Sequence, residues 1–491
     1  MSITWLTSTV RRMLDTGSQS KHIEYYNSLK QRADEACTWI ISSSNFRAWL
    51  EGPNRGTPAS SSKFCILFGE MGSGKSATTS FVVDFLTSHP VFSGSLNPLV
   101  CVYYCKNDNE SNKARSIYRS ILAQVLARMG QLRPRFLDWH EKAQLKNSLI
   151  DPTWDDNALR GFLVDVLATL PRRFYLVLDG VDECDHNSRH HILQFFRECY
   201  EYKAPVKVFL SCRYDDTLEK GLPPGRSILR MKASTERDRI IAAFLVEILL
   251  ARQREEIRKF IVDGLAVQAE GSAIWLKIVL EHLRHPHRGE AEIRKELTDM
   301  PPPGNLSKLY AKLLETTTGK NKQYVTRVEV ALEILATTGR LLTLDELAYA
   351  VTLRLKGNGI SDLSDLQNDV VDPTGLRELM NPFVGISGHG GDAIIRIVHQ
   401  SLKDLVLRKA PADWGSDEHV TEQVKDQRQA KLHSSLLDCC IKYLLLDDIQ
   451  ETELFPEEKL EALERQENGR FSTHIHKRVS TNDYGRTGFS W

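Results

Sequence analysis

The feature that most constrains the fold of this chain is a glycine-rich loop directly behind a short apolar run. The run covers residues 64–68, and the loop that follows reads GEMGSGKS at residues 69–76. The loop fits the pattern G-x-x-x-x-G-K-[ST], and a helical apolar pattern through Val82 and Phe85 comes next. A strand, such a loop and a helix, in this order, predict a phosphate-binding loop (P-loop).

Glycines in this loop let several backbone N–H groups converge on a phosphate chain, and the following helix N-terminus adds a favourable dipole. In such loops the lysine, here Lys75, reaches the β- and γ-phosphates, and the hydroxyl of Ser76 ligates Mg²⁺. The alternative is a chance Gly/Ser/Lys loop, which the flanking strand and helix disfavour. The residues we expect to hold a nucleotide here are Gly69, Gly72, Ser73, Gly74, Lys75, Ser76 and Ala77.

Five short apolar runs predict a parallel sheet. They are separated by segments long enough for crossover helices, as in α/β proteins with helices on both faces of the sheet. The fold class predicted is therefore α/β, with a doubly wound parallel sheet of the P-loop NTPase type. The runs are residues 64–68, 99–104, 174–178, 206–211 and 228–231.

A second polar cluster follows the apolar run 174–178. Asp179 ends that run, and Asp182 and Glu183 come shortly after it. Beside a P-loop, Asp179 is placed to hold Mg²⁺ through water, and Asp182 or Glu183 to orient an attacking water. The alternative for this segment alone is an ordinary acidic loop after a buried strand.

Arg213 follows another apolar run at the same predicted edge of the sheet. It is a candidate sensor of the γ-phosphate, and the alternative is a solvated arginine at a strand end. We therefore take Asp182, Glu183 and Arg213 as catalytic candidates, with Ser76 and Asp179 as metal ligands. His140, His190 and His191 lack metal-ligand spacing and are expected at the surface.

Length and composition narrow the classes of function. The chain has 491 residues, which suggests about three domains, and Lys plus Arg equals Asp plus Glu at 64 each. With no overall charge to attract it, we expect no nucleic acid partner. Nine cysteines without a Cys-x-x-Cys pair are typical of reduced thiols, and no apolar stretch is long enough to span a membrane. These patterns predict a soluble cytoplasmic protein.

Apolar periodicity and helix breakers predict the domain boundaries. Helical periodicity continues through residues 235–285, and Pro301, Pro302, Pro303 and Gly304 mark a boundary. Beyond it, helical patterns at 309–314, 328–335 and 344–353 and a glycine-rich turn at 385–391 predict a winged-helix domain, and 432–446 predicts a further helix. The expected domains are a helical lead-in (1–36, with its helix at 23–36), an NTPase domain (37–232), a helical subdomain (233–300), a winged helix (301–410), a helical and charged region (411–476), and the start of an ankyrin repeat (477–491).

Several motifs together resemble the NACHT family of signal-transduction P-loop NTPases (STAND class), in particular fungal NACHT proteins with a nephrocystin-like N-terminal region. The resemblance covers residues 36–445. Its markers are CTWI at 37–40 with Phe46 and Trp49-Leu50, GEMGSGKS at 69–76, LVLDGVDEC at 176–184, FLSCR at 209–213, GSAIWLKIVLEHL at 271–283, Leu306 and Tyr310, GRLLTLDELAYAV at 339–351, and IVHQSLKDLVL at 397–407.

The resemblance implies a switch that binds ATP or ADP with Mg²⁺, hydrolyses ATP slowly and self-assembles when active. It also implies that His399 contacts the β-phosphate of ADP in a closed state, and that the biological process is nonself recognition or programmed cell death. Relatives often continue into ankyrin repeats, and residues 483–491 are either the start of one or a chance match.

Three rival classes share the same loop. A remodelling ATPase would need a trans-acting arginine and steady turnover, neither of which the sequence indicates. A GTPase would need Asn-Lys-x-Asp, whereas Lys106-Asn107-Asp108 has the wrong order. A scaffold with a vestigial nucleotide site is the third, and intact Lys75, Ser76 and Asp179 count against it.

Overall fold

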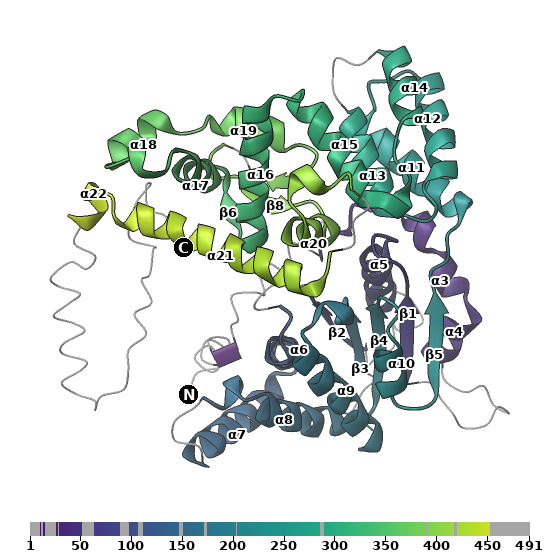
Figure 1. Cartoon of the computed structure of the whole chain (residues 1–491). Helices are drawn as coiled ribbons and strands as arrows, with labels where there is room; N and C mark the ends of the chain where they lie inside the picture. The colour runs from purple at the N-terminus through teal and green to yellow at the C-terminus, as the bar shows by residue number, and fades with distance from the viewer. Residues whose placement is uncertain are drawn as a thin grey trace. The chain divides into compact units, whose positions relative to one another are not determined.

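The computed structural model describes residues 10, 13–14, 26–27, 29–51, 63–88, 98–106, 111–146, 151–170, 174–202, 204–284, 289–388, 390–416 and 420–451. The chain divides into two compact units, Met1–Pro303 and Gly304–Trp491 (Figure 1). The predicted C-terminal repeat at 477–491 lies outside the described residues.

A five-stranded parallel sheet forms the centre of the first unit. Its strand order is β2-β3-β4-β1-β5, so the P-loop strand β1 lies between β4 and β5. All five predicted strands are present, and the predicted α/β fold class is confirmed. Their bounds are β1 (Phe64–Phe68), β2 (Leu99–Tyr104), β3 (Phe174–Asp179), β4 (Val206–Cys212) and β5 (Arg226–Arg230).

Alternate residues of the strands enter two separate apolar cores, one on each face of the sheet. Phe64 and Ile66 of β1 pack into one core with α6, α8 and α9, while Cys65 and Leu67 pack into the other with α4 and α5. Burial on both faces explains why these strands read as continuous apolar runs. The helices around the sheet are α3 (Trp39–Ser42), α4 (Ser44–Glu51), α5 (Lys75–Ser88), α6 (Ala114–Arg128), α7 (Arg133–Lys146), α8 (Asp156–Ala168), α9 (His186–Glu201) and α10 (Asp216–Gly221).

Four helices follow the sheet within the same unit. Their bounds are α11 (Thr235–Leu249), α12 (Glu255–Gln268), α13 (Ala273–Leu283) and α14 (Glu290–Thr298). Apolar periodicity was recognised only as far as residue 285, and α14 lies in the last part of the helical subdomain predicted at 233–300. It is short and strongly charged, with Ile293 and Leu297 as its buried residues, and this leaves little apolar periodicity to detect.

The second unit combines helices with a small antiparallel sheet of order β6-β8-β7. The glycine-rich turn predicted at 385–391 lies only in part between the strands, because its first three residues belong to β7 and the connection to β8 follows them. Its elements are α15 (Leu306–Thr318), α16 (Lys322–Thr337), β6 (Leu342–Thr343), α17 (Leu344–Lys356), α18 (Leu363–Asp369), α19 (Pro373–Met380), β7 (Val384–Ser387), β8 (Ile394–Ile397), α20 (Gln400–Arg408), α21 (Glu422–Leu444) and α22 (Asp447–Gln450).

Three local predictions differ from the structure. The lead-in is not one helix over 23–36, because a turn and bends at residues 30–32 precede the short 3₁₀ helix η1 (Asp34–Cys37). Helix α21 begins ten residues before the predicted 432, within a polar segment. His140 is buried rather than at the surface, since its ring lies 3.1 Å from the carboxylate of Asp151.

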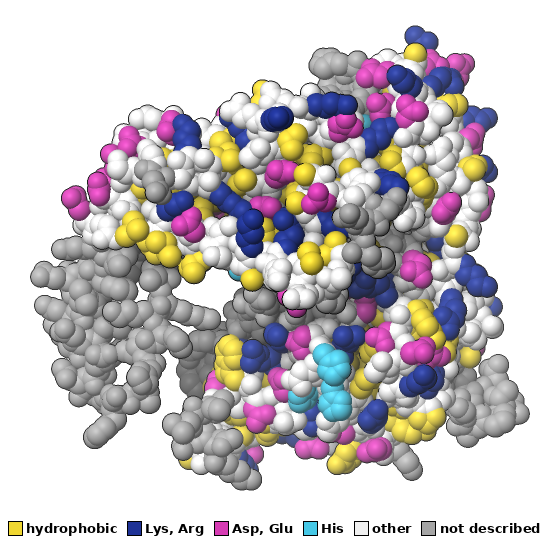
Figure 2. All heavy atoms as spheres, viewed as in Figure 1, with side chains coloured by type: hydrophobic (Ala, Val, Ile, Leu, Met, Phe, Trp, Pro, Cys, Tyr) yellow, Lys and Arg dark blue, Asp and Glu magenta, His cyan; other side chains and the backbone are white. Residues whose placement is uncertain are grey.

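The distribution of thiols and charges agrees with the sequence. All nine cysteines are free thiols, and eight are buried. On the face drawn in Figure 2, acidic and basic side chains are interspersed. Among the described residues, no helix combines the length and apolar character needed to cross a membrane.

Candidate functional site

The P-loop leaves the carboxyl end of β1 and runs into the N-terminus of α5. Gly72 and Gly74 have φ angles of 76° and 96°, a region that favours glycine. The Lys75 Nζ donates to the carbonyl oxygens of Gly69 at 2.9 Å and Glu70 at 2.8 Å. Burial lowers the pKa of this ammonium, and the nearby carboxylates of Asp182 and Asp179 oppose the shift. The loop therefore already holds its lysine across the concave side where phosphates bind in such loops.

Asp179 ends β3 next to the P-loop helix and is 3% exposed. Its Oδ1 accepts hydrogen bonds from Thr79 at 3.0 Å and from the hydroxyl of Ser211 on β4. Burial raises the pKa of Asp179, whereas hydrogen bonds from Ser211, Ser76 and Thr79 lower it. Two hydroxyls, from Ser211 of β4 and Thr79 of α5, thus fix the orientation of one buried carboxylate.

The pair formed by Ser76 and Asp179 has the chemistry that a Mg²⁺ site requires. A hydroxyl and a carboxylate are oxygen ligands, and Mg²⁺ commonly takes one or two protein oxygens together with phosphate oxygens and waters. In the described part of the chain there is no cluster of three or more His, Cys, Asp or Glu suited to a metal.

The turn after β3 places the two acidic catalytic candidates. Gly180 has φ 71°, and a Cβ there would lie 3.1 Å from the carbonyl oxygen of Cys105, so the turn favours glycine. Asp182 and Glu183 follow in a 3₁₀ turn. The carboxylate of Asp182 accepts from the backbone N–H of Arg213 at 3.1 Å and from its Nε at 2.6 Å. Asp182 and Arg213 are therefore partners in one ion pair, a link that the sequence did not reveal.

A turn of the helical subdomain closes on the P-loop. The backbone N–H of Ile274, in the first turn of α13, donates to the carbonyl oxygen of Gly72 at 3.0 Å. A Cβ on Gly72 would lie 2.1 Å from the Cγ2 of Ile274, and one on Gly74 would lie 3.7 Å from the Cβ of Ala273. Residues 271–274 are thus part of the site, although the sequence analysis assigned them no role there.

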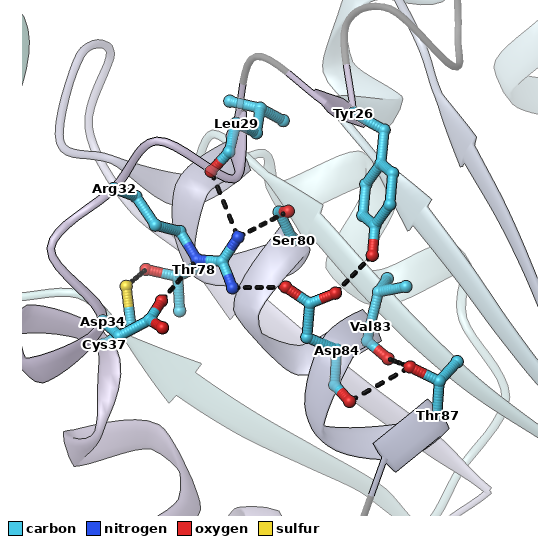
Figure 3. A network of polar contacts seen from close by, with 10 residues as sticks. All are labelled: Tyr26, Leu29, Arg32, Asp34, Cys37, Thr78, Ser80, Val83, Asp84 and Thr87. Carbon is cyan, nitrogen blue, oxygen red and sulfur yellow. Dashed lines mark hydrogen bonds and ion pairs between the residues drawn. The ribbon is translucent and has the colours of Figure 1, made fainter.

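The lead-in holds the other side of the P-loop helix (Figure 3). Arg32 donates to Ser80 at 3.0 Å and forms an ion pair with Asp84, which also accepts from the hydroxyl of Tyr26. The thiol of Cys37 lies 3.9 Å from the hydroxyl of Thr78. These contacts place η1 beside the first turns of α5.

His399 lies in the second unit, where it caps α20. Its Nδ1 accepts from the backbone N–H of Ser401 at 3.2 Å and lies 2.9 Å from the Ser401 hydroxyl. That hydroxyl is also 3.1 Å from the hydroxyl of Tyr310. An Nδ1 that accepts a hydrogen bond leaves the Nε2 to carry the proton of the neutral ring.

Part of the chain matches one protein-family model, and several solved structures of low sequence identity are similar to the chain. The model of the nephrocystin 3 N-terminal domain matches residues 35–213. No curated protein matches the chain.

Among solved structures, the chain is similar to a Walker-type ATPase of Pyrococcus abyssi, with 13% identity, 74% of this chain and 93% of that chain covered, and a TM-score of 0.32. It is also similar to the ORC2 protein of Aeropyrum pernix, with 12% identity, 80% and 92% covered, and a TM-score of 0.31. A third similarity is to Drosophila ORC bound to DNA, with 12% identity, 82% and 92% covered, and a TM-score of 0.32.

The class of the first unit follows from its own features. A parallel sheet has the P-loop between its central strand β1 and α5, and a buried aspartate at the end of β3 is hydrogen-bonded to that helix. Together with the matched N-terminal domain, these features define a P-loop NTPase fold.

Proposed function

We propose that this protein binds ATP or ADP with Mg²⁺ in the P-loop site and uses the nucleotide as a switch. The observation that carries the proposal is the buried Asp179, which accepts hydrogen bonds from Thr79 of α5 and Ser211 of β4 next to the loop that carries Lys75. In this proposal Lys75 binds the β- and γ-phosphates, and Ser76 and Asp179 hold the metal. Mg²⁺ would neutralise charge that develops on the phosphates.

The Asp182–Arg213 ion pair supports a slow rather than a rapid hydrolase. Both carboxylate oxygens of Asp182 accept hydrogen bonds from Arg213, so this carboxylate would have to part from Arg213 before it could orient an attacking water. In the proposed mechanism Glu183 orients the attacking water, and Arg213 leaves Asp182 for the γ-phosphate only when the triphosphate is bound. Slow turnover suits a switch whose resting state contains the product.

The proposed switch also includes the second unit as a winged helix. His399, with its Nε2 proton, would donate to the β-phosphate of ADP, and loss of this contact would release the unit and permit self-assembly. The motif resemblance of residues 36–445 to NACHT proteins supports this role, as well as a process such as nonself recognition or programmed cell death. A ligand shifts such an equilibrium only by the difference in its affinity for the two states.

The test is to purify the full chain without added nucleotide, denature it and identify the nucleotide released, with Lys75→Ala treated in parallel. We expect ADP from the wild type and none from the variant. Lys75→Ala should also weaken the binding of added ATP at least about a hundredfold, because it removes an ammonium group that would contact two phosphates.

Turnover separates the rival functions. A protein that is purified empty and hydrolyses ATP steadily would be a remodelling ATPase. A wild type that neither contains nor binds ATP or ADP would be a scaffold with a vestigial site. A slow hydrolase that retains ADP supports the switch, and Glu183→Gln should then slow hydrolysis without weakening ATP binding.

A further inference from the structure

Two neighbouring charged side chains at the start of α11 carry buried polar atoms without partners. Arg237 is 9% exposed and Asp238 is 1% exposed. Within the described residues, the Nε and Nη2 of Arg237 and the Oδ1 of Asp238 are buried and make no hydrogen bond. A buried polar atom without a hydrogen-bond partner is unfavourable, and more so when it is charged, so in a native structure it calls for an explanation such as an ion, a water or a functional role.

These atoms lie at the turn that closes on the P-loop. The Oδ2 of Asp238 accepts from the backbone N–H of Gly271 at 2.7 Å, and a Cβ on Gly271 would lie 3.4 Å from the Nη2 of Arg237. Three residues further on, Ile274 donates to the carbonyl oxygen of Gly72. Arg237 is therefore one short turn away from the phosphate-binding loop.

Two neighbouring side chains of α5 have different partners around the site. Cys37 lies against Thr78, while the next residue on α5, Thr79, faces Asp179. Consecutive side chains of α5 thus point to two different ends of the site.

The phosphate chain should run between these two ends. Lysine and metal ligands in a P-loop take the β- and γ-phosphates, so Lys75 and Asp179 mark the terminal end. The ribose and base must then leave the loop on the other side. The residues that surround that side are Cys37 of η1, Thr78 of α5, and the turn at 271–274 beside Arg237.

We propose that Arg237 binds the nucleoside part of the nucleotide, donating from its Nε and Nη2 to acceptor atoms of the ribose or the base. This inference rests on the proposed nucleotide binding and extends it to a residue outside the motifs. Asp238 holds the turn at Gly271 in place and is a positioning residue in this arrangement.

The experiment compares two ligands on the full chain, Mg²⁺–ATP and Mg²⁺–tripolyphosphate, by calorimetric titration. Tripolyphosphate carries the phosphates without the nucleoside. Arg237→Gln should weaken ATP binding by about tenfold to a hundredfold, as expected for charged hydrogen bonds, and leave tripolyphosphate binding within about twofold. A general loss of structure would weaken both ligands equally, and that result would overturn the proposal, as would unchanged ATP binding.

Arg239→Gln is the matched control, because Arg239 is on the same helix with a half-exposed side chain and weak ion pairs to Glu236 and Asp263. It should bind both ligands as the wild type does. If Arg237→Gln does not fold, Arg237→Lys keeps the charge and lacks the two-nitrogen fork. It should bind tripolyphosphate normally and ATP weakly, and normal ATP binding would reject the proposal.

Two further ligands distinguish ribose from base. If Arg237 contacts the ribose, 2′- or 3′-deoxy-ATP should bind the wild type more weakly, with no further loss in the variant. If it contacts the base, 7-deaza-ATP or ITP should show that pattern instead. If none of these ligands shows the pattern, the assignment of Arg237 to the nucleoside is contradicted. A wild type that binds neither ATP nor tripolyphosphate would refute nucleotide binding itself, which is a different outcome from a selective effect of Arg237.

Discussion

The two ends of the candidate site differ in how their polar side chains are satisfied. At the proposed phosphate end, Asp179 accepts hydrogen bonds from two hydroxyls, and Lys75 donates to two carbonyl oxygens. At the other end, Arg237 and Asp238 keep buried atoms without partners in the described chain. The phosphate end is preorganised by the fold alone, whereas the other end is left for a ligand to complete.

The largest effect should come from the preorganised end. Asp179→Asn keeps the shape of the side chain and removes its charge, so Mg²⁺–ATP affinity should fall by about tenfold to a hundredfold. Metal-free ATP should bind nearly as in the wild type, because Lys75 and the loop amides remain. Titrations with and without Mg²⁺ measure both, and equal losses in the two would mean that Asp179 does not hold the metal.

The contact between the two ends can be broken at Gly72. Gly72→Ala introduces a Cβ 2.1 Å from Ile274 at a φ of 76°, and should destabilise the protein by about 1–3 kcal/mol. Gly264→Ala in α12 is the control, since its Cβ would meet no atom within 4 Å and alanine is favoured in a helix. Thermal unfolding should show the first variant less stable and the second slightly more stable. If the Gly72 variant is as stable as the wild type, the turn at 271–274 can move away from the P-loop at little cost in free energy.

The burial of Asp179 should also lower the stability of the folded protein in a way that depends on pH. Because burial raises the pKa of Asp179, the folded protein binds this proton more tightly than the unfolded chain does. The stability from this carboxyl is therefore present at acidic pH and lost as the pH rises through its raised pKa. Without nucleotide, Asp179→Asn should unfold a few degrees above the wild type at pH 7, with a smaller difference near pH 4. A difference that stays constant with pH would show that the pKa of Asp179 is not raised.

The smallest effect is expected at His399, where two substitutions separate helix capping from ligand binding. Like the side chains at the phosphate end, the His399 ring already has a hydrogen-bond partner. His399→Ala should lose the cap of α20 and about 1 kcal/mol of stability, whereas His399→Asn should retain the cap. If His399 also binds ADP, both variants should lose ADP affinity and assemble more readily, as measured by titration and light scattering. Two monomeric variants with normal ADP affinity would limit His399 to capping.

The sheet and the loop could be predicted because their signals are local. Each strand is an apolar run, and the predicted strand bounds lie within two residues of the observed ones. The motif at 69–76 by itself predicts a phosphate-binding loop. By contrast, α14 and the first half of α21 are polar, so apolar periodicity did not mark them.

The rest of the site depends on contacts between distant segments. The pairing of Asp182 with Arg213 joins the turns that follow β3 and β4, and the ring of the buried His140 contacts Asp151 in another segment. Arg237 belongs to no motif, and its significance follows only from the position of α11 beside the turn at 271–274. No periodicity or spacing in the sequence could indicate such contacts.

The position of β1 in the sheet also has a consequence for synthesis of the chain. This strand pairs only with β4 and β5, and Phe64 faces Val208, roughly 140 residues later. At ordinary translation rates of about 5–20 residues per second, β1 waits on the order of ten seconds for its first partner. During that time the two edges of this apolar strand have no strand partner on the nascent chain, so we expect chaperone binding at residues 64–68 to matter most until β4 has left the ribosome.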